Sequence, residues 1–341
     1  MESIILPFLL IIIASVFQGS FGLGMKYMAP LRWESWWLIH VTIAMIILPM
    51  TWAFLVVPDL GEVLSISFSD PTMQSVVYMA MFFGFLWGIG GILFGVSVPY
   101  IGLSLTMGIV MGLAGSIGAL IPLLQMENAT TTPQFPYIII GLAISILGVA
   151  ITAKAGIDKD KMTSQTSGEK SNIVKGILIA VSCGVLSALL NVGFVKAAPI
   201  AKLAEEMGAI DRNASLAAWV VVLIGAFAMN AGYAVFLLFK NKSWSSFKIQ
   251  GSSKSYRWAI LASVFWFGAL GIYGQGAALI GPIGGVIGWP MLLGLSLIIS
   301  NFWAYRAGEW SGAKKPFNLL LVGLIILIGS SIILGYSNSV I

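Results

Sequence analysis

Residues 82–122 read FFGFLWGIGGILFGVSVPYIGLSLTMGIVMGLAGSIGALIP, and this stretch decides the fold. It forms two apolar segments around a short break at 99–102, and it contains no charged residue and no histidine. A helix needs about 20 apolar residues to cross a bilayer, so each segment is long enough for one span. Four-residue glycine spacing, which lets helix backbones approach closely in lipid, recurs at Gly84–Gly88, Gly91–Gly95 and Gly108–Gly112. We interpret the pair as packed helices that line a central cavity, with Trp87 as the large ring facing it.

The composition identifies the class of protein. Of 341 residues, 58% are hydrophobic and only 9% are charged, whereas soluble domains carry about 25% charged residues. The chain is therefore an integral membrane protein whose main partner is the lipid bilayer. The net charge of +5 is expected to reflect membrane topology rather than nucleic-acid binding. The single Cys183 excludes an intramolecular disulfide and a cysteine-rich metal site.

The apolar pattern predicts an all-α protein with ten transmembrane helices. The expected spans are 4–25, 36–57, 73–98, 101–124, 135–153, 173–195, 214–239, 257–280, 282–304 and 317–337. The connectors are short and polar, and no glycine-rich nucleotide-binding motif precedes a lysine. An intramembrane transferase would need paired acids near the membrane, and no such cluster occurs in the sequence. We therefore expect a transporter and not an enzyme.

The distribution of basic residues predicts the orientation. Connectors after the first, fifth, seventh and ninth spans carry 15 Lys and Arg residues, and those on the other side carry three. Lysine- and arginine-rich connectors face the cytoplasm. The sequence therefore predicts a multi-pass protein of the plasma membrane with both termini outside the cytoplasm.

Two pairs of segments indicate an internal repeat. Residues 17–30 (FQGSFGLGMKYMAP) align with 186–199 (LSALLNVGFVKAAP), and residues 82–102 align with 265–285. The first span then matches the sixth, and the third and fourth match the eighth and ninth. Five-span halves must run in opposite directions, which is the inverted repeat of many secondary transporters with a substrate site near the midplane. We predict a first repeat at 1–154, a cytoplasmic linker at 155–172 and a second repeat at 173–341.

Short motifs distributed along the chain resemble those of the L-rhamnose–proton symporter family, within the drug/metabolite transporter superfamily. They are WESWW at 33–37, ILP at 47–49, WGIGGILFG at 87–95, GVAITAKAG at 148–156, KGILIAVSCG at 175–184, AAP at 197–199 and Glu309–Trp310. The resemblance implies ten helices, a 5+5 inverted repeat and import of a sugar, L-rhamnose or a related deoxyhexose, by ion-coupled symport. The chain departs from the family pattern at Gly285, where an acidic residue is expected before the tryptophan matching Trp289.

A neutral sugar needs hydrogen-bonding groups for its hydroxyls and flat rings for its C–H faces, placed in a mostly apolar pocket. Side chains of both kinds lie inside the predicted spans. The expected substrate-binding residues are Gln18, Trp87, Asn191, Tyr273, Gln275 and Trp289. An amide in hydrocarbon can also serve only to join helices. Six further tryptophans are expected to lie at the membrane interface: Trp36, Trp37, Trp244, Trp258, Trp303 and Trp310.

His40 is the candidate for proton coupling because a histidine changes charge near neutral pH. The alternative is a histidine at the membrane interface. Backbone carbonyls at glycine-rich turns could instead hold sodium, as at Gly88–Gly91 and Gly271–Gly276. We expect no bound metal and no cofactor besides the co-transported H⁺ or Na⁺. Alternating access is the expected mechanism, and the alternatives left open are an uncoupled sugar facilitator and a drug or metabolite exporter.

Overall fold

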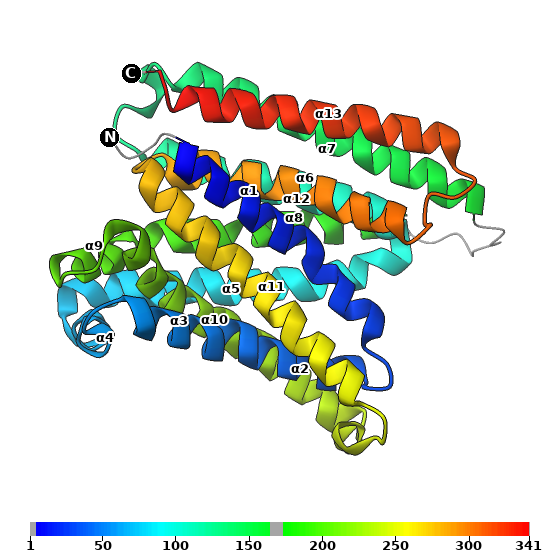
Figure 1. Ribbon diagram of the computed structural model, residues 1–341, viewed down its shortest axis with the longest axis horizontal. Coiled ribbons are helices and arrows are strands. Elements are labelled where there is room, and N and C mark those ends of the chain that lie inside the picture. Colours follow the sequence, from blue (N-terminus) through cyan, green and yellow to red (C-terminus); the bar gives the residue numbers. More distant parts are fainter. Residues whose placement is uncertain (1–4, 164–172, 341) are drawn as a thin grey trace. The chain divides into compact units, whose positions relative to one another are not determined.

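The computed structural model describes residues 5–163 and 173–340, and over these ranges every regular element is a helix (Figure 1). Within them, ten spans are long and apolar enough to cross a membrane. The spans made of one helix are α5 (Pro71–Ile101), α6 (Leu103–Gln125), α7 (Phe135–Thr163), α10 (Asp211–Lys240), α11 (Ser253–Ile280), α12 (Gly284–Arg306) and α13 (Lys314–Ser337). The composite spans are α1 (Ile5–Ser20) with η1 (Phe21–Tyr27), α2 (Trp33–Thr42) with η2 (Ile43–Ile47) and α3 (Leu48–Val56), and α8 (Ile173–Lys196) with α9 (Ala198–Glu206).

The all-helical fold class and the ten spans are confirmed, and the structure adds details that hydropathy did not predict. A short helix, α4 (Leu60–Ser69), lies in the connector between the second and third spans. Helix α7 continues to Thr163, so the first residues of the predicted linker 155–172 are helical. The rest of that linker, residues 164–172, lies outside the described residues.

The second span changes its helical geometry just after His40. Residues Ile43–Ile47 form the π-helical turn η2, and Pro49 follows within the next helix. Proline has no backbone N–H, so the carbonyl four residues before it loses its usual helical partner. A π turn is one way in which a helix absorbs such a disturbance.

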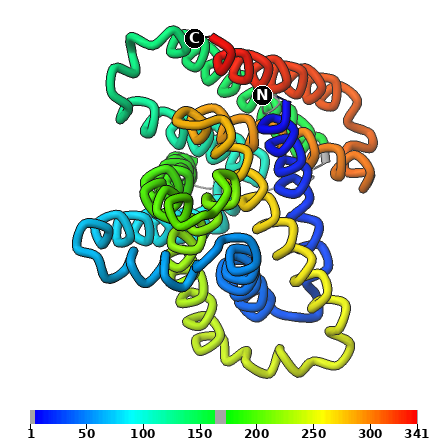
Figure 2. Tube along the Cα trace, turned by 60° about the vertical axis from the view of Figure 1, so that its left-hand side comes forward, coloured from blue at the N-terminus to red at the C-terminus, as the bar shows by residue number. Residues whose placement is uncertain are grey.

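Contacts divide the chain into two compact units. Unit 1 consists of the described residues of Met1–Gly88 together with Gly193–Pro282. Its most extensive helix–helix interface is between α1 and α11, which lie side by side in both views (Figures 1 and 2). A Cβ built on Gly24 would lie 2.6 Å from the Ala262 Cβ, and one on Gly276 would lie 2.9 Å from a carbonyl of α1. The two helices therefore pack closely along their whole length and run antiparallel.

Helices α5 and α10 make the closest backbone approach in unit 1. A Cβ on Gly84 would lie 2.1 Å from the Val222 carbonyl oxygen, and a Cβ on Gly225 would lie 1.8 Å from the Met81 carbonyl oxygen. Glycine is required at both positions because any side chain would collide with a backbone atom. Glycine is not required farther along α5, because a Cβ on Gly91 or Gly95 would meet no atom within 4 Å.

Unit 2 consists of Ile89–Val192 and the described residues of Ile283–Ile341. Its helices α7 and α13 lie alongside each other, as Figure 1 shows, and α6 packs on both α7 and α12. Helix α8 packs on α5, where the Cys183 thiol donates to the Gly90 carbonyl at 3.1 Å. These contacts build a second helical core around small residues.

Lysine-rich connectors come together inside each unit. In unit 1, the Arg32 N–H donates to Ser246 Oγ at 2.9 Å, which joins the connector after the first span to the one after the seventh. In unit 2, the Lys159 ammonium lies 4.8 Å from the centre of the Trp310 ring, which joins the connectors after the fifth and ninth spans. Connectors that follow odd-numbered spans must share one side of a bilayer, and these contacts meet that requirement within each unit.

Candidate functional site

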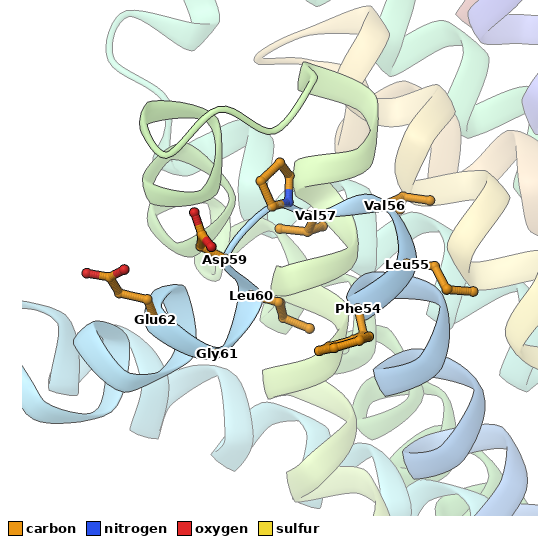
Figure 3. A pocket seen from close by; sticks show the side chains of 9 residues that line it. Phe54, Leu55, Val56, Val57, Asp59, Leu60, Gly61 and Glu62 are labelled. Atoms are coloured by element: carbon orange, nitrogen blue, oxygen red, sulfur yellow. The ribbon is translucent and has the colours of Figure 1, made fainter.

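A cavity of 510 Å³ lies at the turn between α3 and α4 and is lined by residues 54–62 (Figure 3). All of its lining comes from one continuous segment. The Phe54 and Leu55 side chains are 76% and 74% exposed, and the Asp59 and Glu62 carboxylates lie apart from them (Figure 3). An open hollow of this kind does not enclose a ligand, so the candidate site lies elsewhere.

The centre of unit 1 holds a histidine surrounded by aromatic rings. His40 is fully buried, and Trp36 is stacked on it with the two ring centres 5.4 Å apart. The rings of Phe21 and Trp37 lie 5.2 and 5.1 Å from the same imidazole. The Trp266 ring lies edge-on to the imidazole, with the two ring centres 6.2 Å apart. We call His40 and these four rings the aromatic cluster.

Ser263 is the hydrogen-bond partner of the His40 ring. Its Oγ lies 3.1 Å from Nδ1, 2.8 Å from the Ala259 carbonyl oxygen and 3.1 Å from the His40 carbonyl oxygen. The hydroxyl has one hydrogen for these three acceptors. The arrangement that uses the shortest contact, to Ala259, makes Nδ1 the donor to Oγ and leaves Nε2 as an acceptor.

Four polar side-chain atoms of α1 and α2 are buried without a hydrogen-bond partner. They are Gln18 Oε1, Ser35 Oγ, Trp36 Nε1 and His40 Nε2. Gln18 shares a face of α1 with the fully buried Ile11 and Ala14. It precedes Phe21 by one turn, and Phe21 belongs to the aromatic cluster. Buried polar groups are nearly always satisfied in native proteins, so these unpaired atoms are the groups of α1 and α2 that a polar ligand would satisfy.

Two more elements extend the aromatic cluster. The Trp37 Nε1–H donates to Asn230 Oδ1 at 3.1 Å, which joins α2 to α10. The Trp87 ring of α5 lies 5.5 Å from the Trp266 ring of α11. Next to Trp87, a Cβ on Gly88 would lie 3.0 Å from Asn230 Nδ2, so α5 and α10 are in contact at this level. Five segments of unit 1 therefore contribute side chains to one region.

Within the described residues, the Tyr273 ring makes no ring contact with the aromatic cluster, and Gln275 lies on another side of α11. The Tyr273 ring is fully buried and lies 5.7 Å from Phe194 and 6.3 Å from Trp219, in a separate group of rings. Gln275 follows Trp266 by nine residues, which is about two and a half helical turns. It therefore projects from the opposite side of α11 and is half-buried.

Asn191 and Trp289 lie in unit 2, where each joins helices. The Asn191 Nδ2 donates to the Gly118 and Gly285 carbonyls, both at 2.9 Å, and the residue is fully buried. The Trp289 Nε1–H donates to the Ala114 carbonyl at 3.0 Å. Both amide hydrogens of Asn191 and the one indole hydrogen of Trp289 are thus engaged with backbone.

Of the site residues expected from the sequence, His40 is fully buried, whereas Gln18 and Trp87 are half-buried. Trp36 was expected as an interface ring, and that expectation is wrong because its side chain is fully buried. Ser263, Trp266 and Asn230 were absent from the expected site. The spacing of Trp36, Trp37 and His40 along one helix was the available signal, because residues three and four apart share a face.

The site has the chemistry of a pocket for a neutral polar molecule. The aromatic faces suit C–H surfaces, and the unpaired donor and acceptors suit hydroxyls. Among the described residues, no group of three or more His, Cys, Asp or Glu side chains could hold a metal ion. The one titratable group within the aromatic cluster is His40.

Comparison with known proteins identifies the family of this chain. The sequence profile of the family described as L-rhamnose-proton symport protein matches residues 1–339. An L-rhamnose-proton symporter of Mannheimia succiniciproducens is 29% identical over 328 residues, which cover 92% of this chain and 93% of that protein. The L-rhamnose-proton symporter of Yersinia pestis (strain Pestoides F) is 27% identical over 343 residues, with 98% of each chain covered. The family consists of transporters and not enzymes, and this chain belongs to the L-rhamnose-proton symport protein family.

Proposed function

We propose that this protein imports L-rhamnose, or a closely related deoxyhexose, together with protons, and that the aromatic cluster of unit 1 binds the sugar. The observation that carries the proposal is the set of unpaired buried atoms on α1 and α2, two of which belong to the aromatic cluster. A hydroxyl is both donor and acceptor, so one polyol can satisfy the indole N–H of Trp36 and the acceptors of His40 and Gln18. The apolar face and methyl group of a deoxyhexose suit the flanking tryptophans. The names of the relatives point to the same substrate.

His40 is the proton acceptor in this proposal. Its Nε2 carries a free lone pair in a site lined by rings. Protonation turns Nε2 into a donor, and the resulting cation is stabilised by the faces of the surrounding indoles. A sugar oxygen can then accept from Nε2–H. Proton and sugar would thus bind more tightly together than either does alone, which is what symport requires.

The transport cycle we propose is alternating access by a 5+5 inverted repeat of the drug/metabolite transporter kind, with halves at 1–154 and 173–341 joined by the linker 155–172. Helix contacts support it, because they occur in repeat-related pairs. The α1–α11 contact has its counterpart in α8–α5, and α6–α7 has its counterpart in α12–α13. We further propose the plasma membrane as the location, with the lysine-rich ends in the cytoplasm and both termini outside it.

Of the residues expected from the sequence, Gln18 and Trp87 are retained as ligands in this proposal. We assign Asn191 and Trp289 to helix packing because their side-chain hydrogens already bond to backbone carbonyls. Tyr273 and Gln275 are given no direct contact with the sugar. Trp36, Trp37, Asn230 and Trp266 replace them around the ligand.

The experiment is counterflow of labelled sugars in proteoliposomes, followed by uptake with a pH gradient and a sodium gradient imposed separately. We expect counterflow of L-rhamnose and accumulation driven by the pH gradient alone. Accumulation driven only by sodium would contradict the assignment of the proton. Counterflow without accumulation under either gradient would indicate an uncoupled facilitator. Transport of amphipathic cations without sugar counterflow would indicate an exporter.

A further inference from the structure

Unit 2 contains a partly open cavity, with polar and apolar lining residues, that the proposed site does not use. Its volume is 180 Å³, and it lies where α6 begins and where α7 and α12 end. Its polar lining includes Ser104, Thr152, Lys159, Ser300, Asn301 and Trp310. All of these belong to unit 2, so the cavity is complete within one compact body.

The groups around this cavity retain capacity for hydrogen bonds of both kinds. The Ser300 hydroxyl and one Asn301 amide hydrogen are donated to the Leu297 carbonyl, at 3.0 and 2.8 Å. This leaves the oxygen atoms of both side chains as acceptors. The Trp310 side chain lines the cavity and is 93% buried. Acceptor oxygens beside an aromatic ring are a combination that a hydroxylated ligand can use.

The charges at the cavity do not favour an anion. Lys159 is its one basic lining residue and Glu309 its one acidic lining residue. The Lys159 ammonium lies over the Trp310 ring at 4.8 Å and within 4.0 Å of the Asp160 carboxylate. That carboxylate in turn accepts a hydrogen bond of 2.8 Å from the Ser104 hydroxyl. Because Asp160 already balances Lys159, the remaining charge at the cavity is the Glu309 carboxylate, which also disfavours an anion.

We propose that this cavity is a second monosaccharide site, occupied by the sugar on the lysine-rich side of the membrane as it leaves or enters the carrier. The proposal rests on the proposed function for the identity of the sugar and the side of the membrane. A single pyranose ring suits a cavity of 180 Å³, whereas a disaccharide does not. The Trp310 indole supplies the flat surface, and Asn301 supplies an amide that can face two neighbouring hydroxyls.

The kinetic test compares the two faces of the membrane. Asn301→Leu keeps the side-chain volume and removes the amide. We expect it to raise the KM for L-rhamnose about tenfold in inverted membrane vesicles, the effect of losing about 1.4 kcal/mol of binding, and to leave the KM in right-side-out vesicles unchanged. Ser300→Ala should act in the same direction. Ser296→Ala is the matched control, because Ser296 lies one turn away on α12 and donates to the Leu293 carbonyl at 2.8 Å without lining the cavity.

A binding test separates this proposal from the proposed function. In a Cys183→Ser background, Ser300→Cys is labelled with a maleimide in the presence of L-rhamnose or sucrose. Rhamnose at ten times its dissociation constant should slow labelling about tenfold, and sucrose should not. Equal labelling with and without rhamnose, together with an unchanged inner-face KM for Asn301→Leu, would overturn the second site even if the wild type transports sugar. Protection without any wild-type transport would instead contradict the symport function.

Discussion

The Nδ1 of His40 lies 3.1 Å from Oγ of Ser263, and this hydrogen bond determines what the histidine can do. When Ser263 donates its only hydrogen to the Ala259 carbonyl at 2.8 Å, it accepts from Nδ1. The proton of the neutral ring is then on Nδ1, and the lone pair of Nε2 is left in the aromatic cluster. In the coupling we propose, Ser263 is a positioning residue and Nε2 is the atom that exchanges a proton.

Replacing His40 by glutamine should uncouple the transporter. His40→Gln retains an amide that can donate to Ser263 but cannot take up a proton. We expect the variant to lose accumulation driven by a pH gradient and to retain counterflow of L-rhamnose, both measured in proteoliposomes. Gradient-driven accumulation at the wild-type level would show that another group carries the proton.

Ser263→Ala tests the positioning role separately. Removing the hydroxyl leaves the imidazole in place but frees Nδ1, so either nitrogen can carry the proton. The pH at which uptake is half-maximal should shift, whereas His40→Gln should abolish the pH dependence altogether. If the pH profile of Ser263→Ala matches that of the wild type, the hydrogen bond has no part in coupling.

Asn230 should contribute to sugar affinity by orienting Trp37. In Asn230→Leu the Trp37 Nε1–H loses its acceptor at 3.1 Å, and the indole is no longer fixed. We expect the dissociation constant for L-rhamnose to rise about tenfold, as for a lost hydrogen bond of about 1–1.5 kcal/mol. Asn213→Leu is the control on the same helix, because Asn213 makes only a long contact of 3.4 Å at the far end of α10. Equal effects of both substitutions would point to a general disturbance of α10.

Asn191 should behave as a structural residue. Its two amide hydrogens hold carbonyls of α6 and of the start of α12. Asn191→Leu leaves the buried Gly118 carbonyl unpaired, because Pro122 four residues later has no N–H, and this costs about 1–3 kcal/mol. Thermal unfolding in detergent should show a marked loss of stability, while the surviving protein binds L-rhamnose with unchanged affinity. A large loss of affinity in a fully stable variant would restore Asn191 to the substrate site.

Glycines of α5 should differ sharply in their tolerance of a methyl group. In Gly84→Ala the new Cβ would lie 2.1 Å from the Val222 carbonyl oxygen, so α5 and α10 must separate. We expect a destabilisation of about 1–3 kcal/mol. Gly91→Ala adds its Cβ to open space and should leave stability unchanged or slightly higher, since alanine favours the helix. Comparable loss in the two variants would contradict the close approach at Gly84.

The ten spans were predictable because each is a long apolar run, and hydropathy reports burial in lipid directly. Details that depend on tertiary contacts were not predictable from the sequence. The short helix α4 lies in a connector, and η2 reflects a proline whose effect depends on its surroundings. Four-residue glycine spacing occurs at both Gly84–Gly88 and Gly91–Gly95, yet only the first pair meets another helix closely. A spacing rule alone does not indicate which face has a neighbour.

The candidate site was predictable only in part for the same reason. Residue type alone suggested Gln18, Trp87 and His40, since polar and aromatic side chains within spans are few. Trp36 and Trp37 were assigned to the membrane interface because they lie near the start of a span. That inference fails for Trp36, which is fully buried. A connector folds over this helix end, where the Arg32 N–H donates to Ser246. The partnership of His40 with Ser263 joins residues 223 positions apart and leaves no trace in local sequence.

The central claim is that sugar and proton bind together at His40, and proton uptake on addition of sugar tests it most directly. L-rhamnose is added to de-energised vesicles in weakly buffered medium, and the external pH is recorded for the wild type and for His40→Gln. The wild type should make the medium transiently alkaline as protons enter with the sugar, and the variant should take up sugar down its gradient without any change in pH. Equal alkalinisation by both proteins, or sugar uptake by the wild type without alkalinisation, would contradict the claim.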